Sequence, residues 1–269
     1  MSLSMTARKI WTITTKEWAE VFKNRYVLFT VAFLPLVMTA IPLGIIYATR
    51  ESTDFSSVAG DIPAQFTGLC PANLGEGECF QVFLVSQFML MFMIIPLAIP
   101  AAIASYSIVG EKVNRSLEPL LATPIRTIEL LAGKSLAAIL PALLATWIGF
   151  AIFLAGTWLL IQNSAVLTAF LDLRWIIAIF IAGPLMALSA VTFSVIVSSR
   201  VNDPRVAEQV SMIIILPLLG IFFGQMAGLF VLNRQVIVYL VISLSILDSF
   251  LVYLSVQLFQ RETILTRWK

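Results

Sequence analysis

The sequence contains no histidine among its 269 residues. This absence excludes zinc sites built on imidazole, histidine-ligated haem and serine–histidine hydrolases, because each needs an imidazole ring. Charge is also scarce, since charged residues make up 12% of the chain, about half the fraction usual in soluble domains. A soluble protein with this composition would have too few polar groups to cover its surface. The net charge of +2 is too small to indicate a nucleic-acid partner.

In place of charge the chain has long apolar stretches. Hydrophobic residues make up 59% of the sequence, and a stretch of about 20 of them crosses a lipid bilayer as a helix. We expect an all-α membrane protein with about six transmembrane helices, a transmembrane domain over 26–258 and a cytoplasmic tail over 259–269. Pro96 and Pro100 predict a kink in the second helix. The predicted spans are 26–47, 80–109, 135–161, 175–198, 208–232 and 236–258.

The N-terminal segment, residues 1–25, is polar and amphipathic. Trp11, Trp18, Val21 and Phe22 recur at helical spacing. Indole rings and cations favour a helix that lies in the membrane interface. An ordinary cytosolic helix is the alternative.

The cationic residues predict the orientation of the spans. Of the 17 lysines and arginines, all but Arg50, Arg174 and Arg234 fall in the N-terminal segment, the tail, or the loops after the second and fourth spans. An even number of spans places these regions on one side of the membrane. The positive-inside rule therefore predicts a multi-pass protein of the plasma (inner) membrane with both termini in the cytoplasm.

Two features of the outer side and of the fifth span leave alternatives open. Cys70 and Cys79 bracket a turn-rich segment of the predicted outer loop, where a disulfide is favoured over two free thiols.

Gly220, Gly224 and Gly228 recur at intervals of four. This spacing is typical of close helix packing, but Gly220–Leu232 is equally compatible with a short re-entrant hairpin.

Asp248 lies near the middle of the sixth predicted span, where a charge costs at least about 2.5 kcal/mol. Ser245, Ser249 and Ser255 extend it into a thin polar stripe. One interpretation is a residue of a transport pathway or proton relay. The other is a hydrogen-bonded carboxyl that ties helices together, or a shorter span that leaves Asp248 near the outer surface.

The predicted cytoplasmic segment between the second and third spans reads as two short helices. Thr123 is a suitable N-cap, and Pro124 follows at the first helical position, where its missing N–H costs nothing. One helical face carries Leu117, Leu120 and Leu121. The pattern fits an amphipathic hairpin that docks a soluble partner, or a simple interfacial loop.

Two motifs of the predicted cytoplasmic loops resemble the type 2 permease family of ATP-binding-cassette transporters. The first comprises Ser116-Leu117-Glu118, Leu120-Leu121, Thr123-Pro124 and Gly133-Lys134, and the second is the segment Ser198–Gln209 with Asp203-Pro204 at its centre. Pro119 and Ser116 depart from the usual form of the first motif. The resemblance extends from the N-terminal helix to the last span.

This resemblance implies the permease subunit of an exporter that pairs with a second permease copy and with separate ATPase subunits. ATP and magnesium would bind to the ATPase, because this chain has no Gly-x-x-x-x-Gly-Lys-Ser/Thr phosphate loop. The chain itself would be no enzyme and would bind no cofactor. The substrate would be a hydrophobic or amphipathic molecule or an ion. The expected ATPase contacts are Glu111, Glu118, Leu121 and Thr123 of the cytoplasmic coupling hairpin, with Arg8, Lys9, Lys16 and Glu20 of the N-terminal helix.

Two other classes of function are alternatives to an ATP-driven permease. A proton-coupled secondary transporter would use Asp248 and a gradient without nucleotide. An intramembrane enzyme is weakly supported, because the chain has no histidine and no second aspartate within a predicted span to pair with Asp248.

The cysteine pair gives a first testable prediction. If Cys70 and Cys79 form a disulfide, the purified native protein should react with a thiol-alkylating reagent only after reduction, as read by intact mass spectrometry. Closing so short a loop would stabilise the fold by about 2–3 kcal/mol. Two alkylated thiols in the absence of reductant would contradict the prediction.

Overall fold

The computed structural model describes residues 2–49, 76–113, 125–161, 172–230 and 232–258, and within these ranges it contains helices and no strand. The first half of the chain forms α1 (Ser2–Val21), α2 (Arg25–Thr49), α4 (Glu76–Phe92), α5 (Ile95–Val113) and α7 (Thr127–Leu160). The second half forms α9 (Leu173–Ile177), the π-helix η3 (Ala178–Ala182), α10 (Gly183–Arg200), α11 (Pro204–Ser211), the 3₁₀-helix η4 (Met212–Ile215), α12 (Leu216–Met226) and α13 (Arg234–Leu258).

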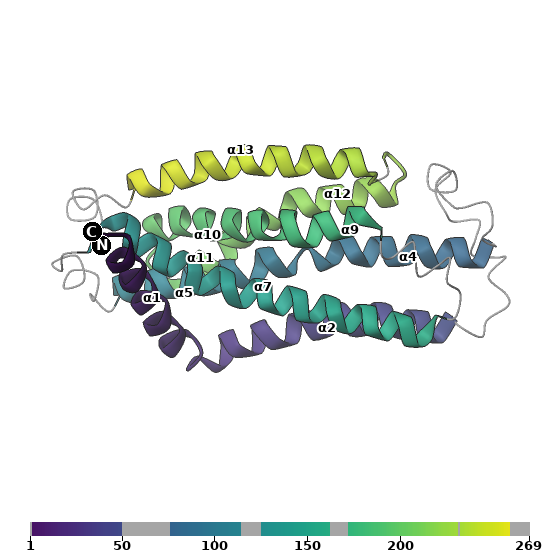
Figure 1. The fold of residues 1–269 in the computed structure, drawn as a ribbon, viewed down its shortest axis with the longest axis horizontal. Helices are drawn as coiled ribbons and strands as arrows, with labels where there is room; N and C mark the ends of the chain where they lie inside the picture. Colours follow the sequence, from purple (N-terminus) through teal and green to yellow (C-terminus); the bar gives the residue numbers. More distant parts are fainter. Residues whose placement is uncertain (1, 50–75, 114–124, 162–171, 231, 259–269) are drawn as a thin grey trace.

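Six helical stretches are long and apolar enough to cross a membrane, and they run side by side along one elongated bundle (Figure 1). They are Val27–Ala48, Cys79–Val113, Thr127–Leu160, Leu173–Arg200, Pro204–Met226 and Arg234–Leu258. The prediction of an all-α membrane protein with about six transmembrane helices is therefore confirmed.

The core of the bundle lies between α5, α7 and α10. α5 packs against α10, α7 and α11, while α10 also packs against α13. Among the 18 most apolar consecutive residues of each stretch, 78% are buried in the α4–α5 stretch, whereas 22% are buried in α2 and 17% in α13. The outer helices therefore turn most of their apolar side chains away from the protein, as expected where lipid replaces water as the solvent.

Prolines explain where the spans lose regular helical geometry. A proline lacks the N–H that would bond to the carbonyl four residues earlier, and its ring crowds that carbonyl. The break between α4 and α5 at Met93 and Ile94 comes just before Pro96, η3 precedes Pro184, and η4 precedes Pro217. The expected kink in the second span is thus present, although Pro100 lies inside α5 without interrupting it.

The fifth helical stretch, Pro204–Met226, begins and ends earlier than the predicted span 208–232, because α12 ends at Met226 and the chain turns at Gly228. Gly228 has a φ of 70°, which favours glycine, and the N–H of Leu229 bonds to the carbonyl of Gly224 at 3.0 Å. A Cβ at Gly224 would lie 2.8 Å from the Phe230 ring, whereas a Cβ at Gly220 would meet no atom within 4 Å. Gly224 and Gly228 therefore shape a turn, and Gly220 packs against no other helix among the described residues.

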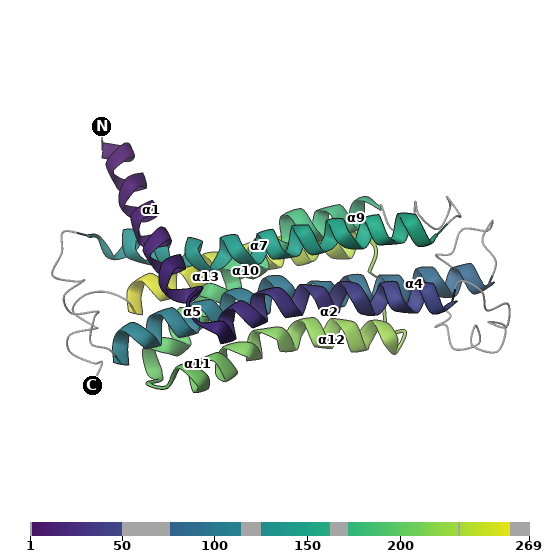
Figure 2. The same ribbon diagram turned by 90° about the horizontal axis from the view of Figure 1, so that it is seen from below.

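The third span is longer than predicted, because α7 begins at Thr127 and its first turns extend to the end of the bundle where α1 lies. We call this end the α1 end. There α1 crosses the bundle at an angle (Figure 2), after a turn that joins it to α2. The last turn of α13 lies at the same end (Figure 1), so the first helix and the C-terminal end of the last helix lie at one end of the bundle.

A close contact fastens α1 to α7. A Cβ on Gly133 would lie 2.7 Å from the Cβ of Ile13, so only glycine fits here without a shift of one helix. The hydroxyl of Thr14 donates to the carbonyl of Gly133 at 3.1 Å, and the indole of Trp18 donates to the carbonyl of Ala137 at 2.9 Å. The predicted N-terminal helix is therefore a packed part of the fold.

We predict that Gly133→Ala destabilises the protein by about 1–3 kcal/mol, the usual effect of overpacking. Gly110→Ala is the matched control, because a Cβ there would meet no atom within 4 Å. The control should leave stability unchanged or raise it by up to about 1 kcal/mol, since alanine favours the helix. Thermal unfolding in detergent measures both. Equal melting temperatures for the two variants would show that α1 does not pack this closely on α7.

Candidate functional site

A buried group of charged and polar side chains joins three helices at the α1 end. It consists of Lys16 and Glu17 from α1, Ser107 and Glu111 from α5, and Lys134 from α7, and we call it the ion cluster. The side chains of Glu17, Glu111 and Lys134 are 3%, 7% and 4% exposed. Lys16 is 44% exposed and lies at its edge.

Lys134 is the centre of the ion cluster. Its Nζ lies 2.9 Å from Glu17 Oε1 and 2.9 Å from Glu111 Oε2, and it donates to Ser107 Oγ at 2.8 Å. Ser107 in turn donates to Glu17 Oε2. Lys16 Nζ donates to Glu111 Oε1 at 3.0 Å. Two carboxylates and two ammonium groups therefore balance one another.

The energetics of the ion cluster follow from its burial. An isolated buried charge costs several kcal/mol, and only close partners of opposite sign offset that cost. Burial by itself would lower the pKa of Lys16, but its hydrogen bond and attraction to Glu111, with Glu17 and Glu20 adding, raise that pKa above its ordinary value. The contribution of Lys16 to stability is therefore complete at neutral pH and is lost only as strongly alkaline pH removes its proton.

A second ion pair ties α1 to the beginning of α7. Lys9 Nζ lies 3.5 Å from Glu129 Oε2, and Glu129 also accepts a hydrogen bond from the backbone N–H of Arg126 at 3.0 Å. Through Glu111 on one side and Glu129 and Lys134 on the other, α1 holds both helices that flank the predicted coupling hairpin. Both stems of that hairpin are therefore fixed to a single helix.

The structure places the predicted contact residues in different surroundings. Glu118, Leu121 and Thr123 lie outside the described residues. Arg8 and Glu20 are exposed on α1, and Glu20 lies 3.4 Å from Lys16. Lys9, Lys16 and Glu111 instead form ion pairs within the chain. The carboxylate of Glu111 in particular is buried between α1 and α7, so its partners in this structure are lysines of the same chain.

Glu17 and Ser107 belong to the site although sequence reasoning did not select them. A signal for Glu17 was present, because it follows Ile13 and precedes Val21 at intervals of four, on the face that the structure buries. A carboxylate on the apolar face of a helix predicts a buried cation as partner. Ser107 carried no comparable signal, since serine is common in apolar helices.

The second predicted motif forms the corner between α10 and α11. Asp203 Oδ1 accepts hydrogen bonds from the backbone N–H groups of Arg205 at 2.8 Å and Val206 at 3.4 Å, and Pro204 begins α11. Asp203 is therefore the N-cap of α11. Lys112 from the end of α5 donates to the carbonyl of Val201 at 3.3 Å, which links this corner to a stem of the coupling hairpin.

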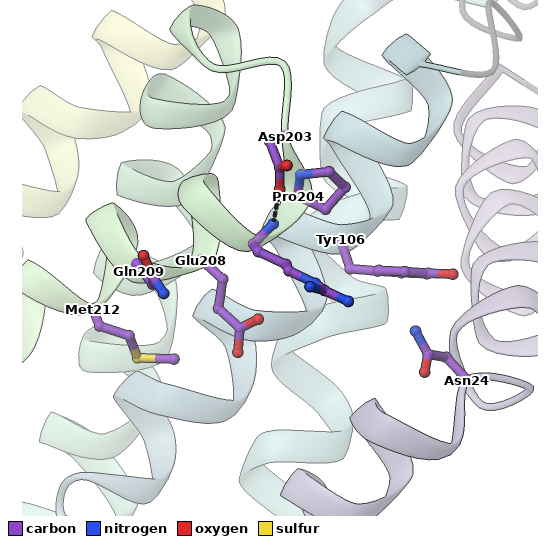
Figure 3. Close-up of a pocket in the computed structure, with 8 residues that line it drawn as sticks. Asn24, Tyr106, Asp203, Pro204, Glu208, Gln209 and Met212 are labelled. Carbon is purple, nitrogen blue, oxygen red and sulfur yellow. Dashed lines mark hydrogen bonds between the residues drawn. The ribbon is translucent and has the colours of Figure 1, made fainter.

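A cavity of about 760 Å³ opens beside this corner. Its lining comes from the turn before α2, from α5, from α11 and from η4, and includes Asn24, Tyr106, Arg205, Glu208 and Met212 (Figure 3). We call it the α11 cavity. Its volume lies within the range typical of small-molecule sites, and its mixture of charged, aromatic and apolar groups fits an amphipathic molecule.

Asp248 is buried between α13 and α10. It is 4% exposed and its Oδ1 accepts a hydrogen bond from the hydroxyl of Ser189. The predicted polar stripe is arranged differently, because Ser245 and Ser249 are exposed and donate to backbone carbonyls of their own helix. Ser255, two turns further on, is buried on the same side as Asp248.

The remaining candidates involve cysteines and metals. Cys79 is buried in the first turns of α4, whereas Cys70 lies outside the described residues, so the bridge between them stays a prediction. Among the described residues, no group of histidine, cysteine, aspartate and glutamate side chains is arranged to hold a metal ion.

We predict that Lys134→Met lowers the free energy of unfolding by about 3–5 kcal/mol, because it leaves the Glu17 and Glu111 carboxylates buried without their central cation. Lys23→Met changes an exposed lysine near the end of α1, and this control should stay within about 0.5 kcal/mol. The double variant Lys134→Met/Glu17→Gln should recover part of the loss, since fewer buried charges remain unpaired. Chemical unfolding in detergent measures all three, and wild-type stability of Lys134→Met would rule out a central role for this lysine.

The comparison with protein families agrees with both loop motifs. The model of the ABC-2 family transporter protein matches residues 11–260. The matched region extends from α1 to just beyond α13 and contains the ion cluster and the α10–α11 corner. No curated protein matches the chain. The family match covers well over half of the sequence, and the chain therefore belongs to the ABC-2 transporter family, as a membrane-spanning permease of an ATP-binding-cassette transporter.

Proposed function

We propose that this permease is the membrane subunit of an ATP-driven exporter, in which a separate ATPase docks at the α1 end. The observation that carries the proposal is the ion cluster, which fixes α1 to both stems of the predicted coupling hairpin. A partner that presses on the hairpin would displace α1, α5 and α7 together, because separating them would expose buried charges to an apolar environment.

The packing of α5 gives this displacement a route into the bundle. α5 lies against α10 and α11, and Lys112 at its end is bonded to the corner between those helices. A shift of α5 would therefore move the wall of the α11 cavity. Coupling in this form needs packed helices with two alternative arrangements, which both ATP binding and substrate binding can bias.

The α11 cavity supplies an entry site for the transported molecule. It lies near the α1 end, on the side where we place the ATPase, so a molecule entering it would come from the cytoplasm. Arg205 and Glu208 contribute charge, while Tyr106 and Met212 contribute apolar surface. This combination favours an amphipathic substrate over a small inorganic ion.

The outer face of α2 supports assembly with a second permease copy. Phe29, Phe33 and Leu36 are 58%, 49% and 59% exposed, and the Phe29 and Phe33 rings stack with centroids 4.6 Å apart. A symmetric pair of subunits would offer two sites to a pair of ATPases and one shared path across the membrane.

Cysteine labelling in whole cells tests this arrangement. In a Cys70→Ser/Cys79→Ser background, Thr123→Cys should react with a membrane-impermeant maleimide only after the membrane is opened, since the hairpin is expected in the cytoplasm. The matched control keeps Cys70 as the single cysteine, and it should react in intact cells. The solubilised permease should also co-purify with an ATPase whose activity responds to amphipathic compounds.

Two outcomes would overturn the proposal. Labelling of Thr123→Cys in intact cells would place the hairpin on the wrong side for an ATPase. Transport by the purified permease in vesicles with a proton gradient and without nucleotide would establish the gradient-driven alternative.

A further inference from the structure

A second, smaller cavity opens near Asp248. Its volume is about 240 Å³, and it is bounded by α5, α10, η4, α12 and α13. We call it the α10–α13 cavity. The described residues that line it are apolar, such as Met186, Pro217 and Leu244, apart from Ser189 and Ser243. A benzene molecule fills an engineered cavity of about 150 Å³, so this space accommodates an aromatic ring with a short chain.

Asp248 lies directly behind the wall of the α10–α13 cavity. Ser189 lines the cavity and donates its hydroxyl hydrogen to Asp248 Oδ1. Leu244 and Leu247, which precede Asp248 on α13, also line it. The carboxyl group is therefore one hydrogen bond away from the cavity space.

The second oxygen of this carboxyl group is left without a hydrogen-bond partner. Asp248 is 4% exposed, and its Oδ2 is buried with no donor within reach. The ion pairs found among the described residues lie in and around the ion cluster and at Asp172–Arg174, and none of them includes Asp248. A cation held close to this carboxyl group would offset part of the cost of burying it.

The chemistry of the cavity specifies such a ligand. A hydroxyl that donates its hydrogen keeps two lone pairs as acceptors, so Ser189 Oγ can receive an N–H from a molecule in the cavity while it still holds Asp248 Oδ1. The apolar lining favours a hydrocarbon body, and the Asp248 carboxyl group favours a cation over an uncharged group of the same size.

We propose that the α10–α13 cavity binds a protonated hydrophobic amine. The apolar body of the amine fills the cavity, and its ammonium group donates to Ser189 Oγ and pairs with the Asp248 carboxylate. The site lies within one subunit and differs from the α11 cavity in position, size and charge. It requires neither the ATPase nor export, because binding is a property of the permease alone.

The test uses two probes of nearly equal size, 4-phenylbutylamine and 4-phenylbutan-1-ol. At neutral pH the amine is protonated and the alcohol is uncharged. Binding to the permease in phosphatidylcholine nanodiscs is measured by isothermal titration calorimetry, with empty nanodiscs to subtract partition into lipid. We expect the amine to bind at least about tenfold more tightly than the alcohol, which corresponds to about 1.4 kcal/mol.

Variants identify the residues that cause this preference. Asp248→Asn should lower the affinity for the amine to the level of the affinity for the alcohol. The affinity for the alcohol itself should not change. Ser189→Ala should reduce the preference for the amine. Ser243→Ala is the matched control, because Ser243 also lines the cavity but donates to the carbonyl of Leu240 on its own helix, and it should keep the full preference.

Specific outcomes decide against the proposal. Equal affinity for the two probes would mean that the carboxyl group does not contribute to binding. An unchanged preference in Asp248→Asn, or an equal loss in Ser189→Ala and Ser243→Ala, would assign the preference to another site. If Asp248→Asn fails to fold, the comparison of Ser189→Ala with Ser243→Ala still shows whether the amine binds beside Asp248. Absence of an ATPase partner would contradict the proposed export function and leave this result standing.

Discussion

The contact of Lys134 with two buried carboxylates is the constraint on which the α1 end depends. Glu17 comes from α1 and Glu111 from α5, and each lies 2.9 Å from the same ammonium group. None of the three helices can move away without leaving a charge unpaired in an apolar environment. The close approach of α1 at Gly133, one residue before Lys134, brings these charges together. The motif Gly-Lys is therefore a structural unit in which glycine provides the space and lysine the charge.

Asp248 is also a buried carboxyl group, but it lacks the cationic partners that the carboxylates of the ion cluster have. In the ion cluster every carboxylate has a cation, so the helices are held together. At Asp248 a single hydroxyl from Ser189 satisfies one carboxyl oxygen, and the other oxygen is left without a donor. A fully paired buried group stabilises a structure, whereas a half-satisfied one favours a ligand that completes it. The two sites are thus suited to different tasks, one to transmitting movement and the other to binding.

Prolines mark where three of the spans lose regular helical geometry. Because a proline cannot complete the helical hydrogen bond to the residue four positions earlier, α4–α5, α9–α10 and α11–α12 each lose regular geometry within the membrane. The core helices α5 and α10 are continuous between those breaks and the α1 end. Packing of α5 on α10 and α11 can therefore carry a displacement from the α1 end to the middle of the bundle, where α10 holds Asp248.

The sequence by itself determined the membrane-spanning class, the number of spans, the N-terminal helix, the Asp203 cap and the family. These depend on composition, on hydrophobic length and on local hydrogen bonding, all of which act between neighbours in the chain. The partners of Lys134, the burial of Glu111 and the bond from Ser189 to Asp248 were decided only by the tertiary structure. In each case the partners are far apart in the sequence, and apolar periodicity in a membrane helix does not distinguish the side that faces lipid from the side that faces protein. Gly224 was ambiguous for the same reason, because only the fold shows that the Phe230 ring, and no second helix, lies beside it.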